Sequence, residues 1–279
     1  MSDPTDAMHK QARAQTDPLF FHDYFMAHGH DVSTKNATAT YVLFEGDVYV
    51  VTCRHVLEML EKRQVNKHSP FPTLALMVDR GLLNLSFFTA DGLQNALKVP
   101  NTPPGAQPLD LAISKLPESY WNILTSKKNK RPIDLDNWHE PRWARAEILV
   151  AAGYPDEHKQ IVDDNGEEKV GAPMPLVAAE IDGRIAKDQR QVAMRSRLEK
   201  PHGFYFSGMS GGPIYVQQDE LLVPVGIIYE GWPQTHDNPV IFDDNGTDVL
   251  FDNRDIIVHG LTLTPDNFAK WLNTSGLKR

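Results

Sequence analysis

Short runs of β-branched and aromatic residues, separated by glycine, proline and asparagine turns, recur through most of this 279-residue chain. The clearest case is residues 39–44 (Ala-Thr-Tyr-Val-Leu-Phe), which a Glu-Gly-Asp turn connects to the run Val-Tyr-Val-Val-Thr at residues 48–52. Such a pair is typical of a β-hairpin. Further strand-like runs follow at residues 73–78, 83–88, 109–116, 147–152, 160–162, 169–170, 176–185, 191–195, 212–217, 222–229, 240–242 and 249–251. Many short strands with turns of this kind predict an all-β sandwich or barrel.

The two ends of the chain depart from the strand pattern. Residues 1–36 are rich in polar side chains and contain a short group of aromatic residues, Phe20, Phe21, Tyr24 and Phe25. We expect this segment to be an N-terminal extension, partly helical, that docks through those rings. Residues 264–274 begin with Thr-Pro-Asp. Because threonine caps helices and proline suits their first turn, a C-terminal helix is expected there.

Charge and cysteine content exclude several classes of protein. The chain has 28 lysine and arginine residues against 37 aspartate and glutamate residues, a net charge of −9, which argues against binding nucleic acid through a basic face. Cys53 is the one cysteine, so no intramolecular disulfide can form. The first residues are acidic, and no apolar run reaches the roughly 18 residues of a membrane helix, so neither a signal peptide nor a membrane span is indicated. We expect a soluble, cytoplasmic protein that binds neither nucleic acid nor membranes.

Residues 208–213, Gly-Met-Ser-Gly-Gly-Pro, carry the sharpest chemical signal. A serine hydroxyl becomes a good nucleophile only when a base takes its proton. The surrounding glycines allow a tight backbone turn, in which N–H groups can converge on one point and stabilise an oxyanion. Taken alone, the segment is equally consistent with a glycine-rich turn that happens to contain a serine.

Two further residues could complete such a site. His55 follows the second strand of the hairpin, and a histidine held at a strand end can act as a general base. Asp110 lies near the start of the apolar run 109–113, where a carboxylate needs a cation or an N–H group as partner. An oriented histidine would provide that partner. Each residue also has an ordinary interpretation, as a structural histidine and as an exposed turn aspartate.

Taken in chain order, His55, Asp110 and Ser210 resemble the catalytic residues of the chymotrypsin-like (trypsin-like) serine peptidases. The sequence looks most like the disulfide-free bacterial branch that includes the Deg-type proteases. The family's Thr-Ala-Ala-His motif stands here as Thr-Cys-Arg-His at residues 52–55, and its Asp-Leu-Ala motif as residues 110–112. Its Gly-x-Ser-Gly-Gly-Pro motif is complete. The resemblance covers about residues 37–272.

This resemblance implies two six-stranded antiparallel β-barrels, with the site in the cleft between them, and a C-terminal helix. The N-terminal barrel would span about residues 37–118 and the C-terminal barrel about residues 147–263. A linker at about residues 119–146 would join them, with a short helix in it, and the helix at 264–274 would close the peptidase domain.

The resemblance also implies a role for each site residue. Ser210 would attack the scissile carbonyl, His55 would accept the serine proton, and Asp110 would fix the tautomer of the imidazole. The backbone N–H groups of Gly208 and Ser210 would form the oxyanion hole. Pairing with an extended substrate, as an added β-strand, is expected for Tyr229, Glu230 and Gly231.

Three departures from the family pattern bear on specificity and activation. The residue six before the serine, at the base of the family's main specificity pocket, is Phe204 here, which predicts a shallow or apolar pocket for small or aliphatic side chains. Met209 stands where some relatives carry the aspartate that pairs with a new N-terminal ammonium, so activation by that ion pair is not expected. Cys53 is expected to be a buried packing residue.

We therefore expect a serine endopeptidase that acts on protein or peptide substrates in regulated intracellular proteolysis. It would be either formed constitutively or gated by residues 1–36 or by a regulatory protein partner.

Two other functions remain open at this point. Residues 208–212 also fit the Gly-x-Ser-x-Gly elbow of the α/β-hydrolases, with Asp252 or Asp255 and His259 downstream, although the chain lacks alternating strand and helix units. A non-catalytic protein-binding module on the peptidase fold would hold the three residues out of register.

Some segments superficially resemble metal sites. Asp-Asp-Asn-Gly occurs at residues 163–166 and 243–246, but without the spacing of a calcium loop, and Asn-Gly between strand-like flanks is typical of a hairpin turn. His-Gly-His at residues 28–30 lacks further ligands at a useful spacing. No metal and no cofactor is expected.

Overall fold

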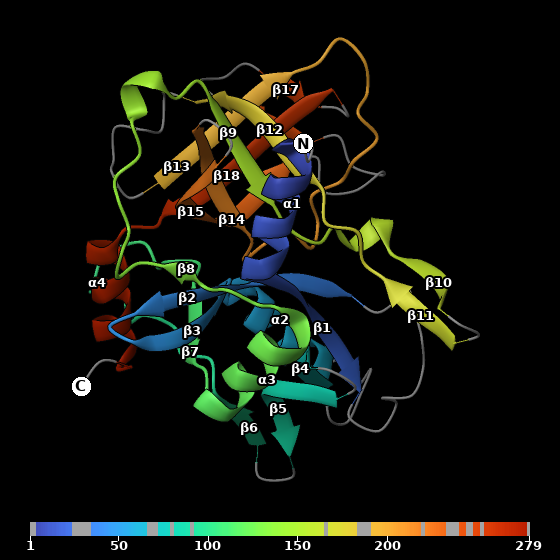
Figure 1. Ribbon diagram of the computed structural model, residues 1–279, viewed down its shortest axis with the longest axis vertical. Coiled ribbons are helices and arrows are strands. Elements are labelled where there is room, and N and C mark those ends of the chain that lie inside the picture. Colours follow the sequence, from blue (N-terminus) through green and yellow to red (C-terminus); the bar gives the residue numbers. More distant parts are fainter. Residues whose placement is uncertain are drawn as a thin grey trace.

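Two large antiparallel sheets, one above the other in Figure 1, form most of the computed structural model of this protein. The structure describes residues 4–23, 35–65, 72–78, 81–89, 92–164, 167–182, 191–218, 221–232, 240–243, 248–251 and 254–277. The expected all-β fold with a C-terminal helix is confirmed.

The N-terminal sheet has the strand order β6-β5-β4-β1-β2-β3-β7, with β8 paired in parallel to β2. Its strands are β1 (Thr16–Asp23), β2 (Asn36–Phe44), β3 (Asp47–Thr52), β4 (Pro72–Val78), β5 (Gly81–Thr89), β6 (Gly92–Asn95), β7 (Ala112–Lys115) and β8 (Ile133–Asp134). Strands β2 and β3 form the predicted hairpin, in which Thr40 lies opposite Val51. In the described residues the sheet has eight strands rather than the expected six. The two additional strands are β1, from the predicted extension, and β8, from the predicted linker.

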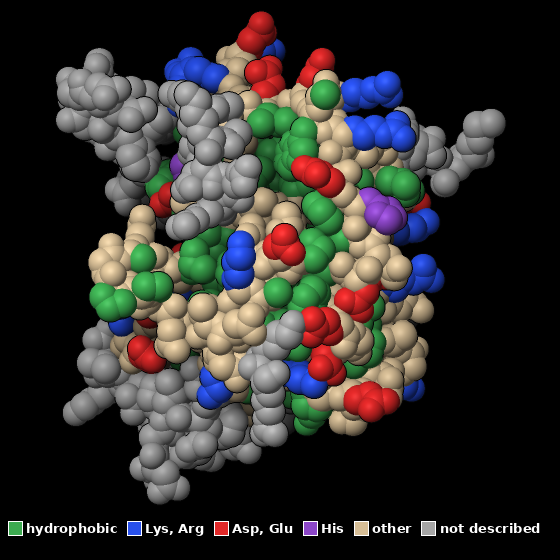
Figure 2. All heavy atoms as spheres, turned by 90° about the vertical axis from the view of Figure 1, so that its left-hand side faces the viewer, with side chains coloured by type: hydrophobic (Ala, Val, Ile, Leu, Met, Phe, Trp, Pro, Cys, Tyr) green, Lys and Arg blue, Asp and Glu red, His purple; other side chains and the backbone are tan. Residues whose placement is uncertain are grey.

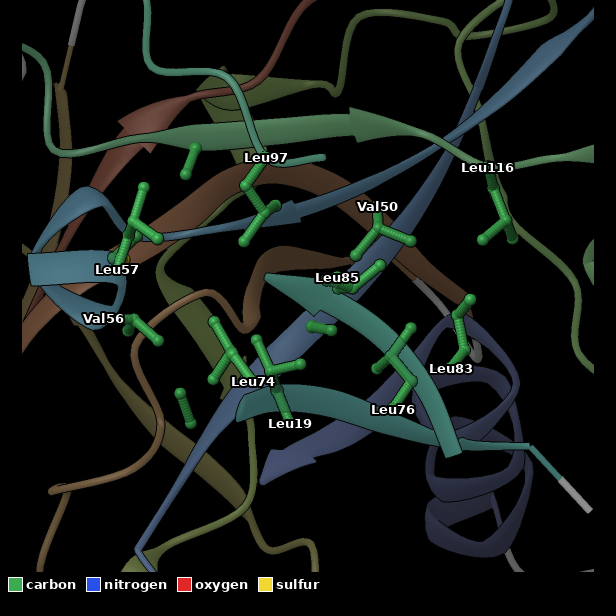
Figure 3. Close-up of a cluster of buried hydrophobic side chains, with 14 of the residues drawn as sticks. Leu19, Val50, Val56, Leu57, Leu74, Leu76, Leu83, Leu85, Leu97 and Leu116 are labelled. Carbon is green, nitrogen blue, oxygen red and sulfur yellow. The ribbon is translucent and has the colours of Figure 1, made fainter. Parts of the chain in front are cut away.

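Strand β1 lies inside the sheet because it pairs with a neighbouring strand on each edge. Thr16 pairs with Thr40 of β2, and Leu19 pairs with Leu76 of β4. Leu19 and Phe21 are fully buried, and Figure 3 shows Leu19 beside Leu74 and Leu76 in the core of this sheet. Of the aromatic residues expected to dock the extension, Phe21 does so as part of a strand, whereas Tyr24 and Phe25 lie outside the described residues.

The C-terminal sheet is a closed barrel with the strand order β12-β13-β18-β15-β14-β9, which matches the expected six strands. Its members are β9 (Ile148–Ala152), β12 (Leu176–Ile181), β13 (Gln191–Arg197), β14 (Pro213–Gln218), β15 (Leu221–Trp232) and β18 (Asp255–Thr262). Its interior is filled by buried aliphatic side chains such as Ile214, Val216, Ile228 and Val258.

Two separate hairpins accompany the sheets. Strand β10 (Gln160–Asp164) pairs with β11 (Glu167–Gly171), and β16 (Val240–Asp243) pairs with β17 (Asp248–Phe251). These pairings agree with the hairpins predicted around the two Asp-Asp-Asn-Gly segments. The Asn-Gly residues of the first turn, residues 244–246 of the second, and the His-Gly-His segment lie outside the described residues.

The helices α1 (Pro4–Gln15) and α4 (Pro265–Ser275) each pack on the sheet that is farther from them along the chain. Met8 and Ala12 of α1 contact Tyr215 and Leu222 of the C-terminal barrel. Phe268 of α4 packs on Phe44 and Tyr49 of the N-terminal sheet, with ring centroids 5.5 Å away in both cases. The chain ends therefore hold the two sheets together.

The remaining helices lie beside the N-terminal sheet (Figure 1). They are α2 (Arg54–Val65) and α3 (Glu118–Lys128), the latter in the predicted linker. Helix α4 begins as predicted, since the Thr264 hydroxyl accepts a hydrogen bond from the Asn267 N–H at 3.2 Å. Among the described residues, none of the helices is long and apolar enough to cross a membrane. On the face shown in Figure 2, acidic and basic side chains of the described residues are interspersed.

Candidate active site

His55 and Asp110 are brought together by two neighbouring strands. Strand β3 ends at Thr52, three residues before His55, and β7 begins two residues after Asp110, with Thr52 opposite Ala112. His55 lies in the first turn of α2, where backbone N–H groups lack a partner inside the helix. Asp110 Oδ1 accepts the His55 N–H at 2.9 Å, and Asp110 Oδ2 lies 2.6 Å from His55 Nδ1. The same carboxylate therefore caps the helix and orients the imidazole.

The electrostatic environment keeps Asp110 ionised. Partial burial acts to raise the pKa of this carboxyl, but the hydrogen bonds and charge of His55 act in the opposite direction and dominate. Arg54 adds a smaller effect, and the pKa of Asp110 lies below its usual range. An ionised carboxylate accepts a proton-bearing Nδ1, which leaves the Nε2 lone pair of His55 available as a base.

Ser210 lies in a tight turn that is attached to strand β2 of the other sheet. The Thr38 N–H donates to the Ser210 carbonyl at 3.0 Å, and the Thr38 hydroxyl donates to the Gly208 carbonyl at 2.9 Å. Gly211 has a φ of +92°, and a Cβ there would lie 2.1 Å from the Thr38 carbonyl oxygen. Only glycine fits this position, which explains in physical terms the glycine after the serine.

In two peptide groups of this loop, Ser207–Gly208 and Met209–Ser210, the N–H has no hydrogen-bond partner among the described residues, whereas the Met209 N–H donates to the Phe206 carbonyl at 3.1 Å. The Asp156 N–H donates to the Ser207 carbonyl at 2.7 Å, and the Gly212 N–H donates to the Met209 carbonyl at 2.9 Å. In a trans peptide the C=O and the following N–H point in opposite directions. The N–H groups of Gly208 and Ser210 therefore point away from those donors, and within the described residues neither has a hydrogen-bond partner.

A cavity of about 400 Å³ brings the three predicted residues together. His55, Asp110 and Ser210 all line it. The other lining residues are Phe21, Lys35, Asn36, Ala37, Val56, Met59, Asp156, Phe206, Ser207, Gly208, Tyr229, Glu230 and Gly231. Although all three side chains are described, only His55 and Asp110 are hydrogen-bonded to each other, and the Ser210 hydroxyl makes no hydrogen bond to His55. Hydrogen bonds between catalytic groups are often long before substrate binds.

The predicted substrate strand lines the same cavity. Strand β14 begins at Pro213, opposite Ile227 of β15, so residues 229–231 extend beyond its end. On the other edge of β15, Glu230 lies opposite His259 and Gly231 opposite Val258 of β18, and the register shifts at Tyr229. In the described part of the chain, no strand covers the β14-side edge of residues 229–231. Burial, with Glu230 and Asp110 nearby, raises the pKa of Tyr229 to about 12, so its phenol is neutral.

Phe204 does not lie where the sequence placed it. Its side chain is 41% exposed, and its ring lies against His158 with centroids 4.9 Å apart. Of the aromatic residues 204–206, which precede the serine loop, Phe206 lines the cavity and Phe204 does not. Phe206 is buried, and a Cβ added at Gly231 would lie 2.9 Å from its Cβ. The segment leading to Ser210 and residues 229–231 are thus in contact at this point.

The α/β-hydrolase alternative is contradicted by the local structure. The residues after Ser210 enter strand β14 rather than a helix. His259 contacts Glu230 at 3.4 Å, and Asp255 is buried in an ion pair with Arg197 at 2.7 Å. Asp252 lies outside the described residues.

Cys53, His55 and Asp110 place three potential metal ligands within 4.8 Å of one another. Burial raises the pKa of the Cys53 thiol well above its usual range, and this thiol donates to the Ile228 carbonyl at 3.0 Å. A metal ion needs the thiolate, and Asp110 already holds His55 Nδ1. The donor set therefore does not suit a metal ion, and Cys53 is a packing residue, as the sequence suggested.

Sequence reasoning missed several residues that shape the site. Thr38 is fully buried and links the two sheets, while Asp156 and Lys159 form a buried ion pair under the serine loop. The alternation Asn-Ala-Thr-Ala-Thr at residues 36–40 was an available signal, because it gives an apolar strand a polar face. Phe206 could not be distinguished from Phe204 without the structure.

Comparison with known proteins adds two distant similarities. Neither a protein-family model nor a curated protein matches the chain. Among solved structures, the thermostable serine protease AL20 from an extremophilic microorganism is 14% identical, with a TM-score of 0.47 over 95% of this chain and 98% of that one. The protease Anisep from Arthrobacter nicotinovorans is 11% identical, with a TM-score of 0.45 over 95% and 97%. At these values the likeness assigns no function, so function must rest on this chain's own side chains.

Proposed function

We propose that this protein is a serine endopeptidase of the chymotrypsin-like type, in which Ser210 is the nucleophile, His55 the general base and Asp110 the residue that orients it. The observation that carries the proposal is the convergence of three features in one cavity. These are the His55–Asp110 hydrogen bond, the serine in a glycine-rich turn, and the N–H groups of Gly208 and Ser210, which have no partner among the described residues.

The chemistry proceeds in two stages. In the first, Ser210 Oγ bonds to the carbonyl carbon of the substrate while His55 Nε2 takes the hydroxyl proton. The negative charge moves to the carbonyl oxygen, which the N–H groups of Gly208 and Ser210 stabilise. The C–N bond then breaks as His55 gives its proton to the leaving amine, and an acyl-enzyme remains. In the second stage His55 takes a proton from water, whose oxygen bonds to the acyl carbon. The bond between that carbon and Ser210 Oγ then breaks as His55 returns the proton to Oγ, which releases the carboxylic acid product and restores the enzyme.

The substrate class follows from the shape of the cavity. The uncovered edge of residues 229–231 suits an extended polypeptide, which adds as a further strand. The contact between Phe206 and Gly231 favours a small side chain immediately before the cleaved bond. The sequence also predicted a shallow pocket, but it attributed the limit on side-chain size to Phe204, whereas this proposal attributes it to Phe206.

We further propose that the enzyme acts in regulated proteolysis inside the cell. Cys53 is buried and unpaired, which fits a protein that folds without disulfides in a reducing compartment. Met209 is buried in the core of the C-terminal barrel, so a charged partner is not required at that position.

A fluorophosphonate probe, which reacts covalently with activated serines, tests the proposed activity. We expect labelling of the wild-type protein and none of Ser210→Ala or His55→Ala. Absence of labelling in the folded wild-type protein would favour a non-catalytic binding module. Equal labelling of wild type and His55→Ala would show that His55 is not the base.

A further inference from the structure

A buried ion pair lies directly beside the loop that precedes Ser210. Lys159 Nζ lies 2.6 Å from Asp156 Oδ1, and the two side chains are only 2% and 5% exposed. Lys159 also donates to Asn36 Oδ1 at 2.9 Å, and Asp156 Oδ1 accepts the Asn36 N–H at 3.0 Å. Asn36 in turn donates to the Tyr154 carbonyl at 2.7 Å. The pair therefore joins the start of β2 to the short 3₁₀ turn η2 (Asp156–His158).

This turn holds one particular peptide group of the active-site loop. The Asp156 N–H donates to the Ser207 carbonyl at 2.7 Å, which fixes the plane of the peptide between Ser207 and Gly208. The Gly208 N–H belongs to the same plane and must point the other way. If that peptide turned over, the cavity would face a carbonyl oxygen instead of an N–H donor.

The loop is packed so tightly on the turn that its position depends on the turn. Gly208 has a φ of +92°, and a Cβ there would lie 2.7 Å from the Tyr154 carbonyl oxygen and 2.8 Å from the Asp156 nitrogen. The Asp156 nitrogen and the Asn36 side-chain amide thus lie against Gly208 of the proposed oxyanion hole, and Lys159 contacts the side chains of both residues.

We propose that the Lys159–Asp156 pair is a positioning device that keeps the Gly208 N–H directed at the substrate carbonyl, so that the oxyanion hole is formed before substrate binds. The proposal rests on the proposed peptidase function. Lys159 and Asp156 do not touch the reacting atoms in this mechanism. They act through the η2 turn.

Lys159, rather than Lys35, is the essential cation of this cluster. Lys35 Nζ also lies 2.6 Å from Asp156, at Oδ2, but its side chain is 55% exposed and its interaction is screened by water. Lys159 is almost fully buried, and removing it leaves Asp156 without its buried counter-charge. Asp156 would then turn toward solvent and Lys35, and the turn that holds Ser207 would lose its anchor.

The test uses a peptidyl diphenyl phosphonate with alanine next to phosphorus, which reacts with the serine and places an oxygen in the oxyanion hole. The dependence of its reaction rate on concentration separates the binding constant from the rate of the covalent step. We expect Lys159→Met and Asp156→Asn each to slow the covalent step about 10- to 100-fold, because one donor of the oxyanion hole is misdirected. For Lys159→Met, whose side chain does not line the cavity, the binding constant should change by less than about twofold. The double variant should be no slower than either single variant, because the pair acts as one unit.

Lys130→Met is the matched control. Lys130 and Asp17 form another buried pair, 3.0 Å apart with both side chains 7% exposed, and Lys130 otherwise contacts the backbone around residues 13–16. This variant should lose stability but keep the rate of the covalent step. If Lys159→Met does not fold, Lys159→Gln, which can still donate to Asp156, provides the same comparison with a smaller loss.

The outcomes that would overturn the positioning proposal differ from those that would overturn the proposed function. An unchanged covalent step in the folded Lys159 and Asp156 variants would overturn the positioning proposal, as would an equal loss in Lys130→Met. A wild-type protein that does not react with the phosphonate, or a Ser210→Ala variant that reacts equally, would instead overturn the proposed function.

Discussion

Replacing Thr38 by valine would remove one oxygen from the contact between the two sheets while nearly preserving the shape of the side chain. That oxygen accepts the Tyr154 N–H at 2.9 Å and donates to the Gly208 carbonyl at 2.9 Å. The Tyr154 N–H belongs to a buried residue, whereas Gly208 is half-buried and partly reached by water. Since a buried polar group left unpaired costs about 1–3 kcal/mol, we expect the free energy of unfolding to fall by about 2–4 kcal/mol.

The assay combines urea unfolding, followed by the fluorescence of the five tryptophans, with the rate of fluorophosphonate labelling at Ser210. Loss of the Gly208 contact should slow labelling at least about tenfold, which corresponds to about 1.4 kcal/mol in the barrier. Thr264→Val is the control, because the Thr264 hydroxyl accepts the Asn267 N–H at 3.2 Å at the start of α4 and Thr264 does not line the cavity. A Thr38→Val protein that loses stability but labels at the wild-type rate would refute this account of how the serine loop is held.

Other changes test other parts of the site. Phe206→Val should permit cleavage after large apolar residues in a peptide library, whereas Phe204→Val should not, and the reverse result would restore Phe204 as the pocket residue. Asp110→Asn should reduce turnover about 10⁴-fold with the serine still present, because the imidazole loses its orienting charge. Folding lowers the pKa of Asp110, so the contribution of this carboxylate to the free energy of unfolding is present above about pH 4 and is lost as the pH falls through the lowered pKa. The stability of Asp110→Asn should therefore fall less steeply with decreasing pH than that of the wild type. Gly211→Ala should destabilise the fold by at least about 1–3 kcal/mol in thermal unfolding, since its positive φ strains any other residue.

Local sequence patterns were sufficient for most of the strands and drew attention to the residues on which the proposed chemistry depends. The alternation in residues 39–52 specifies a hairpin, and Thr264 with Pro265 specifies the start of α4, because these signals act over a few residues. The role of residues 16–23 was less visible. Strand β1 contains a proline and charged residues, and only its pairing with β2 and β4 shows that it belongs inside the sheet.

Residues that support the site from a distance could not be predicted in the same way. Thr38 and Gly208 are 170 positions apart, and Asp156 reaches both Asn36 and Ser207 only after both sheets have formed. Contacts of this kind depend on how the sheets are stacked, and no short motif encodes them. The same holds for Phe206, whose proximity to Gly231 is a property of two loops meeting in space.

The reciprocal packing of the terminal helices determines how this molecule can move. Helix α1 packs on the C-terminal barrel and ends at Gln15, and the next residue, Thr16, already pairs with β2 of the N-terminal sheet. No flexible linker therefore separates the helix from the strand. Helix α4 makes the complementary attachment from the other end. To move the two sheets apart, either a terminal helix would have to lose its packing contacts or β1 would have to lose its hydrogen bonds to β2 and β4. In the proposed reaction, an extended peptide would therefore enter a groove whose width is fixed.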